Sequence, residues 1–138
     1  MTRIAPIAPN ALALSALALC GCGRDGDRRD VQLVTERFFT ALQRDDGTLA
    51  CAQLSSDTRS ELESQEGKPC REAITGLGLQ GAGITRVQVF LTNAKADLAD
   101  GDSVFLGFTP QGWRLSAIGC EPQGDKPADR PFDCTVQA

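Results

Sequence analysis

Cysteine is the residue type with the widest range of chemistry in this chain of 138 residues, which contains six cysteines. Cysteines can carry a lipid, form disulfide bonds, bind a metal ion or react as thiolates. The chain has no His and no Tyr. The absence of His excludes catalysis by a histidine base and excludes metal sites that contain histidine. The absence of Tyr excludes a tyrosine general acid.

The first 22 residues have the pattern of a secretory signal. One cation, Arg3, precedes an apolar run from Ala11 to Leu19. This run is too short to cross about 30 Å of hydrocarbon as a helix. A cationic start, an apolar middle and small residues at the end describe a cleaved signal peptide.

The apolar run ends in the sequence Leu19-Cys20-Gly21-Cys22, which resembles the lipobox of bacterial lipoproteins. In that motif a small residue precedes the cysteine that is acylated and becomes the new N-terminus. Cys22 follows Gly21, and its acylation leaves four cysteines for pairing. Acylation of Cys20 would instead leave Cys22 unpaired in an oxidising compartment. We therefore expect a lipid on Cys22, the alternative being a plain secreted protein cleaved nearby.

The other four cysteines, Cys51, Cys70, Cys120 and Cys134, allow three pairings. Their spacing favours neighbours, Cys51 with Cys70 and Cys120 with Cys134, and each bond would add roughly 3 kcal/mol of stability. Because no CxxC spacing is present, we expect no metal site, and we expect no other cofactor.

Three aspartates, Asp97, Asp100 and Asp102, are the remaining candidates for acid–base chemistry. They lie in or beside the hairpin signal Asp100-Gly101-Asp102, where a solvated turn is the simpler interpretation. We assign no catalytic residue, and a carboxylate-based enzyme is the less favoured alternative.

Helical periodicity marks the first half of the chain that follows the signal. Val31, Val34, Phe38 and Leu42 form one apolar stripe, with Asp30 as the expected N-cap. The expected helices cover residues 30–44, 48–54, an exposed segment that begins within 55–58 and ends near 66, and 69–77.

Alternation with a period of two residues replaces the helical pattern after a glycine-rich loop. The expected strands cover residues 85–92, 95–99, 103–109 and a segment that starts at 113. The stretch from Glu121 to Ala138 has three Pro and little periodicity, which predicts an irregular tail. The pattern therefore predicts an α+β fold in which N-terminal helices pack on a curved four-stranded antiparallel sheet.

Several residues on the strands alternate with the expected core set and should face away from the helices. Apolar residues on such a face can mark a partner or ligand surface, although cover by the C-terminal tail or ordinary exposure would also account for them. The candidate binding face comprises Arg86, Gln88, Phe90, Phe105, Arg114 and Ile118.

The chain resembles small bacterial lipoproteins with an NTF2-like (SnoaL-like) ectodomain. The resemblance covers most of residues 30–137 and rests on cysteine, glycine, proline and core positions. These are Val34, Phe38, Phe39, Ala41, Leu42, Ala50, Cys51, Leu54, Ser55, Pro69, Cys70, Gly101, Asp102, Val104, Phe105, Leu106, Gly112, Trp113, Gly119, Cys120, Pro122, Asp133 and Cys134. The resemblance implies the fold, the two bridges and the location, and it transfers no chemistry, because NTF2-like enzymes use an aspartate with a Tyr or His that this chain lacks.

The sequence thus predicts a signal peptide over 1–21, a polar tether over 22–29 and an ectodomain over 30–138. The formal net charge of -4 and the pI of about 4.8 argue against nucleic acid as a partner. The expected protein is lipid-anchored on the extracytoplasmic face of the cell membrane and is not an enzyme. It would bind an envelope protein or a small ligand, the alternative being a structural or regulatory envelope component without a ligand.

Overall fold

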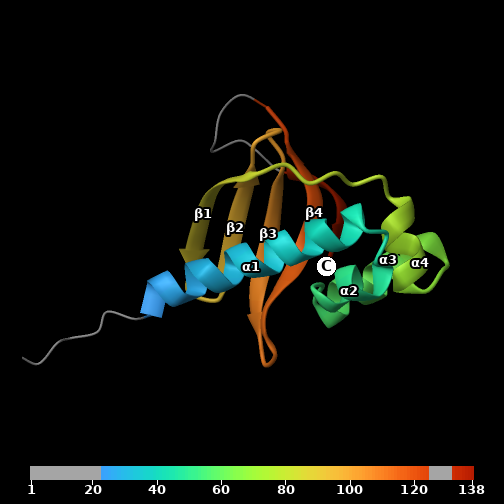
Figure 1. Ribbon diagram of the computed structural model, residues 1–138, viewed down its shortest axis with the longest axis horizontal. Coiled ribbons are helices and arrows are strands. Elements are labelled where there is room, and N and C mark those ends of the chain that lie inside the picture. The colour runs from blue at the N-terminus through green and yellow to red at the C-terminus, as the bar shows by residue number, and fades with distance from the viewer. Residues whose placement is uncertain (1–22, 125–131) are drawn as a thin grey trace, which may run out of the picture.

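The computed structural model describes residues 23–124 and 132–138, which form four helices followed by a five-stranded antiparallel sheet (Figure 1). The helices are α1 (Gly23–Gln43), α2 (Gly47–Ala52), α3 (Ser56–Glu66) and α4 (Cys70–Gly76). The strands are β1 (Ile84–Phe90), β2 (Asn93–Leu98), β3 (Ser103–Thr109), β4 (Gly112–Pro122) and β5 (Phe132–Gln137). The predicted α+β class is confirmed.

Helix α1 buries the expected stripe, including Val31, Val34 and Phe38, against the sheet. It begins at Gly23, so residues 23–29 of the predicted polar tether are helical and continuous with the rest of α1. The reason is a tertiary contact: Trp113 Nε1 donates a 3.0 Å hydrogen bond to Asp27 Oδ1, which holds the first turns on the body.

The short helices begin where local side chains satisfy free backbone N–H groups. Asp46 accepts from the N–H of Leu49 at the start of α2, and Ser55 accepts from the N–H of Thr58 at the start of α3. The hydroxyl of the buried Thr58 donates to the carbonyl of Ser116, which ties α3 to β4. The start of α3 lies within the predicted range 55–58, whereas Asp30, the expected N-cap of the first helix, lies inside α1.

The sheet is a simple meander with the strand order β1-β2-β3-β4-β5. The prediction of four strands is wrong, because residues 132–137 pair with β4 as a fifth strand. Apolar and polar side chains alternate along β5, with Phe132, Cys134 and Val136 less exposed than Asp133, Thr135 and Gln137, so the sequence carried a strand signal that the prediction of an irregular tail missed. Its place is held by pairing, in which Cys134 stands directly opposite Cys120.

The core lies between α1 and one face of the sheet, and α2, α3 and α4 extend it beyond β4 (Figure 1). The buried strand residues include Ala94, Ala96, Val104, Leu106 and Leu115. A short parallel bridge between Leu54 and Leu115 occupies the edge of β4 that β5 leaves free. Within the described residues, no helix is both long enough and apolar enough to span a bilayer.

Candidate binding face of the sheet

The register of the first three strands shows which predicted residues share a face. Gln88 pairs with Lys95, which pairs with Phe105, and Arg86 pairs with Asp97. These residues alternate with the buried Ala94, Ala96 and Leu98, so they lie on the face opposite the core, here called the outer face. Phe90, opposite Asn93, is on the same face and is 57% exposed.

Arg114 stands opposite Gly107 of β3, in line with the outer face. Its guanidinium donates to the carbonyl of Trp113 at 2.8 Å, and it also lines a groove between the β3–β4 turn and α2 and α3. Arg114 therefore lies at the margin of the outer face and not at its centre.

Ile118 is not part of the outer face: it is fully buried in the core beside Val136. The prediction fails because the pairing of β3 with β4 shifts twice, between Ser103 and Leu106. An extra residue in one strand reverses which side chains face the core. Strict alternation counted from Trp113 cannot locate such shifts.

The centre of the outer face holds an aromatic and charged cluster that joins β2, β3 and β5. The rings of Phe105 and Phe132 pack edge to face with centroids 5.0 Å apart, and Lys95 Nζ lies 4.8 Å from the Phe132 centroid. Lys95 also forms a 2.8 Å ion pair with Asp97, whose side chain is 26% exposed. Phe132 was missed because its strand was missed, whereas Lys95 follows from its alternation with Ala94 and Ala96.

The ionisation of Asp97 is controlled by its neighbours. Partial burial acts to raise its pKa, but hydrogen bonds from Lys95 and Ser103, with the charges of Lys95 and Arg86, lower the pKa below its ordinary value. The Ser103 hydroxyl donates to Asp97 Oδ1 at 2.8 Å. Asp97 is therefore an ionised partner in a cross-strand network.

The other two candidate carboxylates lie at the turn between β2 and β3. Asp100 is exposed, and the N–H of Asp102 donates to its Oδ1 at 3.0 Å. Burial, with the charges of Asp100 and Glu121, raises the pKa of Asp102. Asp100 and Asp102 thus interact within the turn, whereas the side chain of Asp97 contacts Lys95 and Ser103.

Hollows border the outer face in the part of the chain that the structure describes. A hollow of about 340 Å³ lies beside the aromatic cluster and is lined by Phe105, Ser116, Phe132 and Cys134 among others. The open groove that Arg114 lines is about 950 Å³ in volume, with Arg59, Arg71, Asp57 and Glu63 on its walls. Because basic and acidic side chains both line this groove, its charge favours neither an anionic nor a cationic ligand.

The four cysteines of the described chain form the two bonds that their spacing favours, Cys51–Cys70 and Cys120–Cys134. The first joins α2 to the start of α4, and the second joins β4 to β5. In residues 23–124 and 132–138, no group of three or more His, Cys, Asp or Glu side chains is placed to hold a metal ion. Cys22, the expected lipid site, lies outside the described residues.

The chain matches no protein-family model, no curated protein and no solved structure.

Proposed function

We propose that this protein is a lipid-anchored extracytoplasmic module that uses the outer face to bind another component of the cell envelope. The observation that carries the binding proposal is the Phe105–Phe132–Lys95 cluster, which lies on the sheet face away from α1. Aromatic rings beside a cation suit a partner that offers an apolar group next to an acidic one.

The disulfide bonds support a location outside the cytoplasm. Disulfides persist in oxidising compartments and are rare where thiols are kept reduced. With Cys51 bonded to Cys70 and Cys120 to Cys134, acylation of Cys22 would leave the mature chain with no free thiol. The pattern of residues 1–22, which resembles a signal peptide that ends in a lipobox, also supports the proposal.

The contacts of Asp97 favour a binding module over an enzyme. A carboxylate held ionised by Lys95 and Ser103 is suited to stabilising a strand pair. General acid–base work at neutral pH needs a pKa moved toward 7, whereas this pKa moves the other way. The order of helices before a curved meander also supports the NTF2-like resemblance, which we keep as part of the proposal.

The anchor is tested by intact mass spectrometry of protein extracted from membranes. The proposal expects a chain that begins at Cys22, carries acyl groups and has no free thiol. A chain that retains Met1, or one with four reduced cysteines, would contradict it.

The binding face is tested by photo-crosslinking in intact cells. A photoreactive residue at Gln88 on the outer face is compared with one at Gln43, which is exposed at the end of α1. We expect a discrete adduct from position 88 that Phe105→Ala weakens severalfold. Identical adducts from both positions, or none from position 88, would refute a specific surface and favour a structural component without a ligand.

A further inference from the structure

Three large apolar side chains are exposed at one end of the sheet. Phe90 is 57% exposed, Leu91 is 93% exposed and Phe108 is 56% exposed. We call these three residues the apolar tip. Leu91 also has a φ of 52°, a left-handed conformation that is uncommon for a bulky residue other than glycine. Such strain occurs preferentially at functional positions.

The meander brings these residues together from different turns. Phe90 and Leu91 lie where β1 turns into β2, and Phe108 lies near the end of β3. The N–H of Phe108 donates to the carbonyl of Thr92 at 2.8 Å, so the two segments are in direct contact. Phe90 lies on the outer face and Phe108 on the core side, so the apolar tip spans the thickness of the sheet end.

The start of α1 lies at the same end of the molecule. The Phe108 ring packs against Trp113 with centroids 5.3 Å apart, and Trp113 Nε1 donates to Asp27 at 3.0 Å. Asp27 is four residues after Gly23, which corresponds to about 6 Å along a helix. Figure 1 likewise shows the first turns of α1 on the side of the sheet where β1 turns into β2. The chain position that precedes Gly23 is Cys22.

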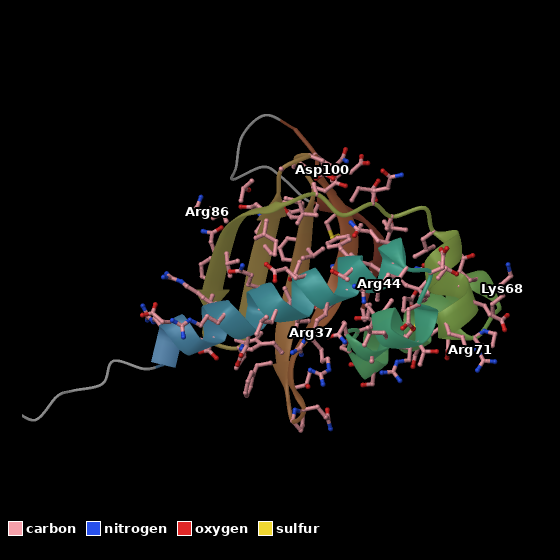
Figure 2. The ribbon with its side chains drawn as sticks, viewed as in Figure 1. Arg37, Arg44, Lys68, Arg71, Arg86 and Asp100 are labelled. Carbon is pink, nitrogen blue, oxygen red and sulfur yellow. A yellow bond between two sulfur atoms is a disulfide. The ribbon has the colours of Figure 1, made fainter. Side chains whose placement is uncertain are left out.

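Acidic residues gather at the opposite end of the sheet. Asp100 and Asp102 lie in the turn between β2 and β3, and Glu121 lies near the end of β4, close enough for its charge to raise the pKa of Asp102. Figure 2 shows Asp100 at the end of the sheet away from the β3–β4 turn. The molecule therefore has an apolar end beside the start of α1, where residues 23–30 carry equal numbers of acidic and basic side chains, and an acidic end facing away from it.

We propose that the apolar tip rests in the interface of the membrane that holds the lipid anchor, with the acidic end pointing away. This inference rests on the proposed acylation of Cys22. Because α1 begins at Gly23, a lipid on Cys22 would be joined directly to the body, and the side chains nearest to it would meet the bilayer. Anionic lipid repels acidic groups, so the charge distribution selects the same orientation. Proteins that lie on a membrane without crossing it are commonly held by a lipid group together with apolar side chains that enter the interface.

The orientation is tested with tryptophan probes in the full, membrane-extracted protein reconstituted into vesicles of phosphatidylethanolamine and phosphatidylglycerol. Phe90→Trp reports on the apolar tip, and Ala99→Trp, exposed at the acidic end, is the matched control. Trp113 is 2% exposed, and the unsubstituted protein gives its background signal. Brominated phosphatidylcholine in the vesicles quenches a tryptophan that touches the acyl region.

We expect the Phe90→Trp emission to shift to shorter wavelength on vesicles and to be quenched severalfold more strongly than that of Ala99→Trp. Adding Leu91→Asp to Phe90→Trp should remove most of this quenching while the circular dichroism spectrum stays unchanged. Equal quenching of the two probes would overturn the inference. So would a shift that appears without vesicles as protein concentration rises, because a second copy would then cover the tip.

The mass of the same preparation separates this inference from the proposed function. Acylated protein whose Phe90→Trp probe is not quenched overturns the orientation and leaves the anchor standing. Unacylated protein whose probe is still quenched on added vesicles refutes the anchor and supports a tip that binds lipid by itself.

Discussion

Removal of the Cys51–Cys70 bond should destabilise the protein by an amount that follows from the length of the loop it closes. The bond closes a loop with a sequence separation of 19 residues, and the Cys120–Cys134 bond closes one of 14 residues. The chain-entropy model assigns about 3 kcal/mol to each, with a difference of only about 0.3 kcal/mol between them. For a domain stable by about 5 to 15 kcal/mol, one bond is a large share of the total.

The assay is urea unfolding of the double variant Cys51→Ala/Cys70→Ala, followed by the fluorescence of Trp113. This indole is buried and hydrogen-bonded to Asp27, so its emission reports on contact between α1 and the sheet. We expect the free energy of unfolding to fall by about 3 kcal/mol or more, because shortening buried side chains adds to the entropic loss.

The matched control is Cys120→Ala/Cys134→Ala, for which the model predicts nearly the same loss. A loss below about 1 kcal/mol for the Cys51–Cys70 variant would refute the argument from loop closure. A large loss for only one of the two variants would show that local packing, and not chain entropy, controls the effect.

Three further substitutions test local contacts. Gly47→Ala should lower the free energy of unfolding by about 1 to 3 kcal/mol in a urea titration, because the added Cβ would collide with the backbone carbonyl of Arg71. An unchanged midpoint would show that α2 can move away from α4 without loss of stability. Asp27→Ala should cost about 1 to 3 kcal/mol by thermal unfolding and change the emission of Trp113, since the indole N–H loses a charged acceptor; an unchanged spectrum would contradict the contact. Asp102→Asn should raise the free energy of unfolding at pH 7 by less than about 0.5 kcal/mol, and raise the melting temperature slightly, because the folded state raises the pKa of this carboxyl. The gain should disappear as pH falls through the carboxyl range, where the native Asp102 takes up its proton, and a gain that persists at low pH would exclude the electrostatic cause.

Asp97 should have the opposite pH dependence. Because its folded pKa is lowered, its ionised form stabilises the protein above the unfolded pKa of about 3.9, and this contribution is lost as pH falls through the folded pKa. Asp97→Asn should therefore destabilise the protein at pH 7 by about 0.5 to 1 kcal/mol, the range of a partly exposed pair. Melting temperatures measured across the acid range check this, and an equal loss at pH 7 and below the carboxyl range would point to packing instead.

Local patterns anticipated much of the fold. The stripe of Val31, Val34 and Phe38 lies in the core, and the strands around Ala96 and Val104 alternate as expected. These predictions succeeded because a side-chain period is a local property that a single element imposes on its own residues. The outer-face placement of Arg86, Gln88, Phe90 and Phe105 follows from the same rule.

Two of the errors came from contacts between distant segments. The early start of α1 depends on a hydrogen bond between Asp27 and Trp113, which are 86 residues apart. Strand β5 depends on its pairing with β4, and the burial of Ile118 depends on two shifts in the register of β3 with β4. The contact of Asp27 and the register shifts have no signature within a short window of sequence, whereas the apolar–polar alternation of residues 132–137 is a local signature of β5.

Residues close together in the chain encode the α+β class, the main helix stripe, four of the strands and the cysteine spacing that favours neighbouring bonds, so these features could be predicted. The contact of Phe132 with Lys95 and Phe105, and the proximity of Phe90, Leu91 and Phe108 to the start of α1, emerge only when the whole chain is folded. Strand register and helix docking depend on the free energy of packing the whole chain, and no single segment contains that information.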